Sequence, residues 1–205
     1  MSEPADTQGP EYAARLEQLA GARWKRWLDV QAPYRWNLRR LGLGRTLEVG
    51  CGVGRNLAHL PPGSVGIDPN PHAVETARRR GCTALLPDAF ATSAHATQPF
   101  DALLCAHVLE HLQGGAAQQL VADYVPFLRP AALVVLITPQ EAGFRSDPTH
   151  VQLLEFAALR SILEAVGCDP LRAYSFPFPR VVGRFFRHNE FVVVGVRRGG
   201  STSRR

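Results

Sequence analysis

The stretch "AHVLEHL", residues 106–112, brings two histidines and a glutamate together in the order His-x-x-Glu-His. On a continuous helix His107 and His111 would share a face, with Glu110 beside them. One class of zinc hydrolases carries this signature. Imidazole and carboxylate groups also act as general bases. The pattern permits either a metal site or a proton-transfer site, and the surrounding secondary structure distinguishes between the two.

A glycine-rich turn, "EVGCGVGRNL", follows a predicted strand at 45–49. Gly50, Gly52 and Gly54 let the backbone turn sharply and approach a ligand closely. The amide groups of a following helix start would favour an electron-rich ligand. Asp68 ends the next predicted strand, where a carboxylate can accept hydrogen bonds from ribose hydroxyls. The pattern therefore predicts a site for a nucleoside derivative.

The spacing of the glycines distinguishes between nucleoside cofactors. Binding of a nicotinamide dinucleotide requires a third glycine in the spacing G-x-G-x-x-G. In this register that position is Arg55, and the spacing is G-x-G-x-G, preceded by Glu48. We therefore expect that the chain binds neither NAD nor FAD usefully.

The elements that would position these residues alternate along the chain. Short β-type runs and helical patterns follow one another, which is typical of a doubly wound, mostly parallel α/β sheet. A helix is expected to begin at Pro33, and Asn70 with Pro71 is expected to begin another. The predicted strands are 45–49, 64–68, 82–87, 100–106, 132–138, 170–176 and 190–197. The predicted helices are 11–28, 33–41, 53–60, 71–80, 115–128 and 153–167.

Composition excludes several classes of protein. The chain has 205 residues, 45% of them hydrophobic, and no apolar run long enough to span a membrane. Its net charge of +5 is concentrated in the ends, because residues 46–196 carry −2, so a nucleic-acid surface is unlikely. None of the four cysteines forms a CxxC pair, and the N-terminus has no secretory signal. These features predict a cytoplasmic protein with reduced thiols.

Together the motifs resemble those of the class I S-adenosylmethionine-dependent methyltransferases over residues 45–167. The quoted segments are "LEVGCGVGRNL", "VGIDPNPHAVETAR", "PDAF", "FDALLCAHVLEHL" and "LRPAALVVLITP". One departure is Ala131-Ala132, where the family usually has a glycine pair, and it concerns turn geometry. The resemblance implies a seven-stranded Rossmann-like fold preceded by helices. The expected parts are a mobile N-terminus (1–10), a helical cover that orders when cofactor binds (11–44), the methyltransferase domain (45–198) and a disordered basic tail (199–205).

The resemblance implies a set of cofactor-binding residues. The glycine loop would hold the methionine part, Asp68 the ribose, and Asp88 with Ala89 the adenine edge, while Ala106 would line the floor. Glu48 would either orient the glycine loop or reach the amino group of the cofactor. The full set is Glu48, Gly50, Gly52, Gly54, Asp68, Asp88, Ala89 and Ala106.

Candidates for the acceptor side lie beyond the predicted strand ends. His107 and His150 are the candidate catalytic residues, with His107 favoured as a general base, although many methyl transfers need only positioning. Each histidine could instead be a loop or core residue with a purely structural role. Tyr34, Trp36, His111 and Arg180 are candidates for contacting substrate. Tyr34 and Trp36 could equally pack on the sheet, and Arg180 could simply be solvated.

The glutamate–histidine pair at 110–111 is common in the resembled family without a metal, which disfavours a zinc hydrolase. A branch that methylates the 2′-hydroxyl of small RNAs does bind a metal here, with an acid where this chain has His107. We therefore expect no stoichiometric metal, and instead a substrate pocket lined by His107 and His150. The predicted reaction is S-adenosylmethionine-dependent methyl transfer to a small molecule, a sugar or a lipid precursor. The alternatives are a non-catalytic cofactor-binding module and, among enzymes, RNA 2′-O-methyl transfer.

Overall fold

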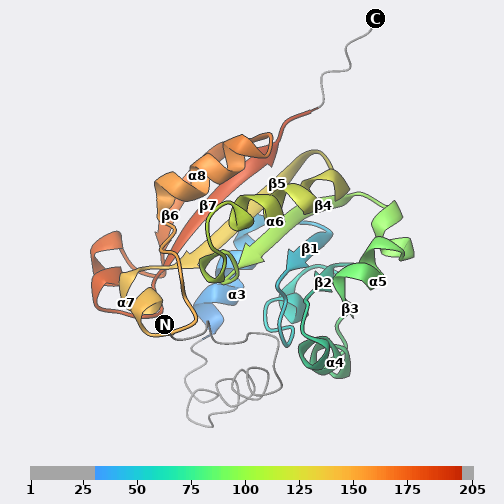
Figure 1. Cartoon of the computed structure of the whole chain (residues 1–205), viewed down its shortest axis with the longest axis horizontal. Helices are drawn as coiled ribbons and strands as arrows, with labels where there is room; N and C mark the ends of the chain where they lie inside the picture. The colour runs from blue at the N-terminus through green and yellow to red at the C-terminus, as the bar shows by residue number, and fades with distance from the viewer. Residues whose placement is uncertain (1–30, 200–205) are drawn as a thin grey trace, which may run out of the picture. The chain divides into compact units, whose positions relative to one another are not determined.

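The structure, a computed structural model, describes residues 31–199 (Figure 1). The chain divides into two compact units, Met1–Thr97 and Gln98–Arg205. The expectations for residues 1–30 and 200–205 lie outside the described residues. In the part of the chain that is described, no helix is long and apolar enough to cross a membrane. All four cysteines are free thiols.

Seven strands follow the order β3-β2-β1-β4-β5-β7-β6, and this confirms the predicted fold class. Parallel pairing joins β1 to β2, β2 to β3, and β4 to β5, whereas β7 runs antiparallel to both β5 and β6. The strands are β1 (Thr46–Val49), β2 (Val65–Ile67), β3 (Ala84–Leu85), β4 (Phe100–Ala106), β5 (Leu128–Pro139), β6 (Cys168–Phe176) and β7 (Glu190–Arg197).

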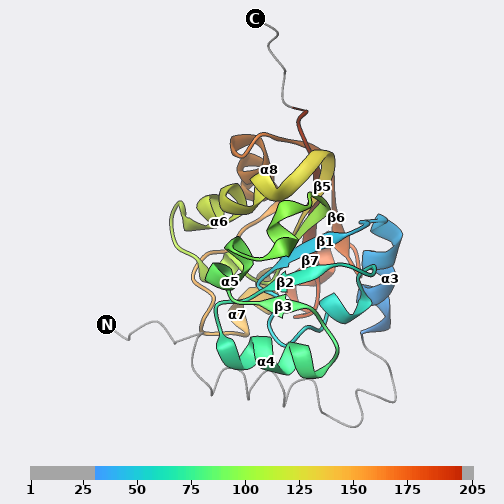
Figure 2. The same ribbon diagram turned by 90° about the vertical axis from the view of Figure 1, so that its right-hand side faces the viewer.

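In the first unit, helices begin where the sequence places proline. Pro33 stands in the first turn of α3 (Ala32–Leu41), and Gly42 ends that helix in a left-handed conformation with φ of 63°. Asn70 caps α4 (Pro71–Arg79), since its side chain accepts hydrogen bonds from the amides of His72 and Ala73. The remaining elements are η1 (Leu57–His59), α5 (Pro87–Ala91) and η2 (Ala94–Thr97). Helix α4 packs beside β3 (Figure 2).

The predicted helix at 53–60 is wrong. The chain there forms turns followed only by the short 3₁₀ helix η1. Leu57 of η1 and Cys51 pack on β2 at Gly66, where an added Cβ would lie 2.5 Å from Leu57 and 2.6 Å from Cys51. A close approach of loop and strand replaces a regular helix, and the buried cluster of Cys51, Leu57, Val74, Ala77 and Ala84 compensates for the lost helical hydrogen bonds.

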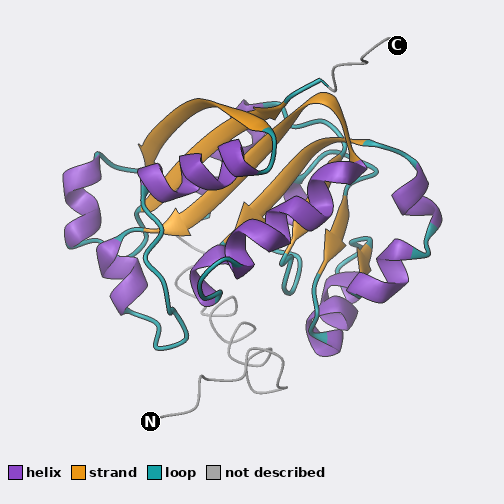
Figure 3. Ribbon diagram, turned by 45° about the horizontal axis from the view of Figure 1, so that its top comes forward, coloured by secondary structure: helices purple, strands orange, loops and turns teal. Residues whose placement is uncertain are grey.

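In the second unit, β4 is almost wholly buried, and so is the part of β5 from Ala132 to Pro139, as central strands should be, whereas residues 129–131 of β5 are exposed. Helices α6 (Ala116–Tyr124) and α8 (Phe156–Ala165) contact each other, and α8 packs on β6 and β7 (Figure 3). The other elements are η3 (Leu109–His111), η4 (Val125–Phe127), α7 (Glu141–Arg145) and η5 (Arg180–Arg184). Only η3 follows β4 directly, so His107 and His111 do not share a helical face.

Two predicted boundaries in this unit need correction. The helix expected at 115–128 ends at Tyr124, and β5 begins at Leu128 rather than at residue 132. Ala131 lies within β5 with φ of 61°, a left-handed conformation that favours glycine. The departure from the glycine pair therefore leaves an alanine in a strained backbone conformation.

Candidate cofactor and acceptor site

The glycine loop wraps over the end of β2. The amides of Gly50 and Cys51 both donate to the carbonyl of Ile67, at 2.7 and 3.1 Å. Gly50, Gly52 and Gly54 all have positive φ angles, of 74°, 51° and 78°. Side chains are disfavoured in that conformation, so glycine is required for the turn. The loop thus has the conformation needed for backbone to approach a ligand closely.

Glu48 is buried in β1 directly before this loop. Its Oε1 accepts a hydrogen bond from Asn56 at 3.0 Å, while its Oε2 has no hydrogen-bond partner in the described chain. Burial raises the pKa of Glu48 to about 8, against the opposing effect of the Asn56 hydrogen bond. One oxygen therefore holds the loop through Asn56, and the other is a buried acceptor without a hydrogen bond in the described chain. The geometry thus shows the loop-holding role of Glu48, while its contact with the amino group of the cofactor stays a prediction.

Asp68 follows β2 and is 9% exposed. Its Oδ2 accepts the amide of Gly52 at 2.8 Å and its Oδ1 that of Asn70 at 2.9 Å. Burial raises the pKa of Asp68, although both amide hydrogen bonds lower it. A carboxylate has about four acceptor sites, so capacity remains for ribose hydroxyls. The carboxylate also holds the glycine loop in place, a structural duty that the sequence did not reveal.

Asp88 and Ala89 are placed by α5, which directly follows β3. Both residues are exposed, while Phe90 anchors the short helix in the core. The positions are therefore accessible to a ligand, and their assignment to the adenine edge stays a prediction. Ala106 is buried at the end of β4 in the second unit.

His107 stands immediately after β4 with φ of 59°, a rare conformation for a non-glycine residue. Its Nε2 lies 2.8 Å from Glu190, and its Nδ1 lies 3.4 Å from Glu110. Burial acts to lower the pKa of His107, but the two neighbouring carboxylates, Glu110 and Glu190, raise it to about 10. The ring is nevertheless 45% exposed, so solvent weakens these effects. Both nitrogens face carboxylates, which leaves no free lone pair for the general-base role expected of His107.

Glu190 belongs to this arrangement and was missed by the sequence analysis. It begins β7, where it pairs in register with Pro139 of β5 and Phe176 of β6. The residue lies 83 positions from His107 in the chain. Only the antiparallel return of β7 beside β5 brings the two together, and no local motif signals that pairing.

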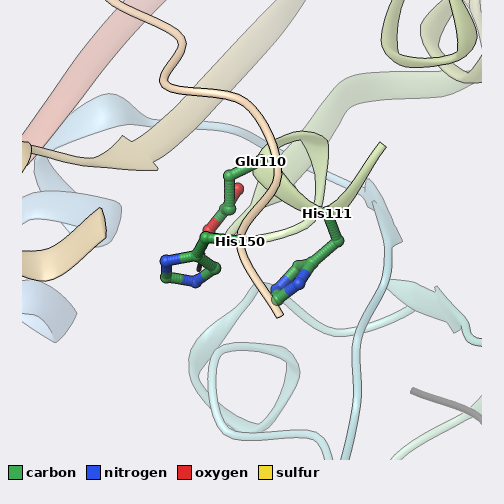
Figure 4. A group of neighbouring side chains, drawn as sticks. All are labelled: Glu110, His111 and His150. Atoms are coloured by element: carbon green, nitrogen blue, oxygen red, sulfur yellow. Dashed lines mark ion pairs between the residues drawn. The ribbon is translucent and has the colours of Figure 1, made fainter. Parts of the chain in front are cut away.

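Glu110, His111 and His150 lie together, with one ligand-type atom from each within 4.8 Å of the others (Figure 4). Glu110 is fully buried, and the loop carrying His150 is fixed to it because the amides of Val151 and Gln152 donate to its carbonyl. The rings of His111 and His150 meet edge to face with centroids 4.8 Å apart. Burial lowers the pKa of His111, and the neighbouring His150 adds to this effect. All three residues are candidates from the sequence motif and the loop after β5, and the structure brings them together.

Arg180 is neither free nor simply solvated. Its two terminal nitrogens bind the two oxygens of Glu141 at 2.8 and 2.6 Å, and Glu155 lies 3.7 Å away. An anionic substrate at Arg180 would have to compete with this bidentate pair. In the first unit, Trp36 of α3 is 55% exposed and stacks against Arg40, while Tyr34 is half-buried. Neither aromatic ring is part of the packed core.

A glycine loop held by a strand-end carboxylate, in an α/β sheet of this order, defines a protein that binds a nucleoside-containing cofactor. Residues 47–134 match a family described as a methyltransferase domain. No curated protein sequence matches the chain. This match supports the predicted resemblance to the class I S-adenosylmethionine-dependent methyltransferases, and S-adenosylmethionine is the cofactor that the resemblance implies.

Solved structures share this fold at low sequence identity. A magnesium protoporphyrin IX methyltransferase from Synechocystis PCC 6803 with bound S-adenosylhomocysteine is 17% identical, with a TM-score of 0.67, and the alignment covers 94% of this chain and 97% of that one. A SAM-dependent methyltransferase from Archaeoglobus fulgidus is 18% identical, with a TM-score of 0.66 and coverage of 91% and 99%. An N-methyltransferase from Bradyrhizobium japonicum WM9 with bound S-adenosylhomocysteine is 19% identical, with a TM-score of 0.65 and coverage of 90% and 97%.

Proposed function

We propose that this enzyme methylates a small-molecule, sugar or lipid-precursor acceptor bound at the carboxyl end of β4. The observation that carries the proposal is His107, a strained residue at that strand end whose ring is exposed and held by two carboxylates. Strain of this kind costs about 1–3 kcal/mol and clusters at functional sites. Two of the proteins with a similar fold are a magnesium protoporphyrin IX methyltransferase and an N-methyltransferase.

The cofactor supplies a methyl group on a positively charged sulfur: the carbon–sulfur bond breaks with its electrons kept by sulfur, and the acceptor atom forms the new bond to carbon. For an uncharged acceptor a proton must then leave. We propose that Glu48 Oε2 binds the ammonium group of the cofactor, that Gly50, Gly52 and Gly54 admit its methionine part, and that Asp68 binds its ribose.

On the acceptor side, we propose that His107 orients the acceptor rather than deprotonating it. We propose that His111 and His150, whose Nδ1 atoms lie beside backbone carbonyls, offer nitrogen lone pairs on this side. Asp88, Ala89 and Ala106 remain proposed cofactor contacts, and Tyr34, Trp36 and Arg180 remain proposed substrate contacts. The four free thiols support our further proposal that the enzyme works in the reducing cytoplasm.

Labelled methyl transfer tests the acceptor class. The enzyme would be incubated with methyl-labelled S-adenosylmethionine and, separately, with small-molecule, lipid and RNA fractions of a cell extract. Mass spectrometry of co-purified compounds would then identify the acceptor. We expect label in the small-molecule or lipid fraction and its loss in Asp68→Ala. Label confined to RNA, and removed by ribonuclease, would refute the proposed acceptor class.

A further inference from the structure

The buried carboxylate of Glu110 has no role in the methyl transfer proposed above. Its carboxylate is fully buried, and neither oxygen has a hydrogen-bond partner in the described chain. The nearest basic nitrogens are Nδ1 of His107 at 3.4 Å and Nε2 of His150 at 3.9 Å. Both distances are long for a hydrogen bond to an ionised group. A buried carboxylate that has ion-pair neighbours but accepts no hydrogen bond is costly, and a further group that binds its oxygens would offset this cost.

Hydrogen bonds fix which nitrogen of each neighbouring histidine is available. Nδ1 of His150 lies 2.9 Å from the carbonyl of Phe144, so it must donate there, and Nε2 keeps its lone pair. Nδ1 of His111 lies 3.1 Å from both the carbonyl and the hydroxyl of Thr149. The Thr149 hydroxyl donates its hydrogen bond to Asp147 at 2.7 Å, so Nδ1 of His111 is the donor toward Thr149. In both neutral rings the lone pair is therefore on Nε2.

This arrangement is the one found around metal-binding histidines. Such rings donate their second nitrogen to a backbone carbonyl or carboxylate, which fixes the tautomer and orients the ring. Here Thr149 and Phe144 supply those carbonyls. Bonds of about 2.0–2.1 Å to one tetrahedral ion place ligand atoms about 3.3 Å apart. One ring nitrogen of each histidine and one oxygen of Glu110 already lie within 4.8 Å of one another, so the three side chains would have to move closer together to bind one ion (Figure 4).

We propose that Glu110, His111 and His150 bind a divalent transition-metal ion. Two imidazoles and one carboxylate suit zinc, manganese or iron, and three protein ligands leave a coordination position open. This departs from our sequence-based expectation of no metal, because the structure shows a buried carboxylate that accepts no hydrogen bond in the described chain and two oriented rings. If the proposed methyl transfer holds, the open position would take a hydroxyl oxygen of the acceptor and lower its pKa.

Metal content and binding test the site without any assay of activity. The full chain would be purified with a tag free of histidine, analysed for metals, stripped with a chelator and titrated with Zn²⁺, Mn²⁺ and Co²⁺ by calorimetry. We expect about one equivalent of metal, and visible absorption bands of a low-symmetry Co²⁺ complex. Loss of one of three protein ligands should weaken binding at least tenfold in His111→Ala and in Glu110→Gln.

His188→Ala is the matched control, because His188 is an exposed histidine in the same unit that is not part of the cluster. It should bind metal as the unaltered chain does. Circular dichroism and binding of S-adenosylhomocysteine would show that each variant is folded, and His150→Ala provides a second variant if one fails to fold. Absence of metal binding in the folded, unaltered chain would refute the site, as would unchanged binding in all three variants. Binding of S-adenosylhomocysteine in the same samples tests the cofactor site separately.

Discussion

Asp68 holds the glycine loop and is the proposed ribose contact, so its loss should lower both cofactor affinity and stability. Asp68→Ala removes the acceptor of two backbone amides and the proposed ribose contact. Losing hydrogen bonds to a charged group costs roughly 1.5–3 kcal/mol, or about ten- to a hundredfold in affinity. We expect weaker binding of S-adenosylhomocysteine by calorimetry, together with a lower free energy of unfolding.

Asn70→Ala separates the two effects. It removes the cap of α4 while leaving the Asp68 carboxylate and the backbone amide of residue 70 in place. Loss of a cap typically costs about 1 kcal/mol of stability, and affinity should change little. If Asp68→Ala binds the cofactor product with unaltered affinity, the ribose lies elsewhere.

Glu48 should make stability depend on pH. Its pKa is about 8 in the folded chain against an ordinary value of 4.5, so the folded state holds a proton that the unfolded state releases. The stability that this group contributes is complete below pH 4.5 and is lost as pH rises to 8, by about 1.4 kcal/mol per pH unit. Glu48→Gln, which mimics the protonated acid, should remove this slope in urea unfolding between pH 5 and 8. Equal slopes in both proteins would show that Glu48 is ionised when folded.

Cofactor binding should also cause the protonated carboxyl group of Glu48 to lose its proton. An ammonium group beside Oε2 favours the ionised carboxylate, so binding of S-adenosylhomocysteine at pH 7 should release protons from Glu48. Calorimetry in buffers of different ionisation enthalpy measures this release. Its persistence in Glu48→Gln would assign the proton to another group.

At the scale of elements, the strain at Ala131 is open to direct measurement. Ala131 is exposed with φ of 61°, a conformation that costs a non-glycine residue roughly 1–2 kcal/mol. Ala131→Gly should therefore raise the free energy of unfolding, by about 0.5–1 kcal/mol after the extra chain entropy of glycine is subtracted. Ala132→Gly is the contrasting control, because Ala132 is buried without a positive φ and should lose stability. Stabilisation absent at 131 would mean that the turn adopts another conformation.

Local patterns predicted most elements because capping and periodicity act over a few residues. Pro33, Gly42 and Asn70 mark helix ends in the structure as they do in the sequence. The helix prediction for residues 53–60 was wrong because the packing of Leu57 against Gly66 overrides helix propensity. That contact joins two separate elements, so a local pattern does not contain it. The conformation of the glycine loop and the place of Asp68 at a strand end were likewise predictable from one turn and one strand, while their binding of the cofactor stays a prediction. Glu190 and the loop-holding role of Asp68 depend on tertiary neighbours, so no sequence window contains them.

Across the whole molecule, cofactor binding should reach beyond the glycine loop. We predict that residues 11–44 cover the bound cofactor, and the exposed aromatic face of Trp36 on α3 supports this. Hydrogen exchange with and without S-adenosylhomocysteine should show greater protection across this segment, and NAD should leave it unaltered. At a hundredfold excess over its dissociation constant the ligand adds about 2.7 kcal/mol to the free energy of unfolding, so exchange that needs global unfolding slows everywhere. Amides that exchange through local opening test the predicted cover directly. Their exchange slows only where the bound ligand or the covering segment protects them. If protection rises in 45–70 but not in 11–44, the N-terminal segment packs on the fold without covering the cofactor.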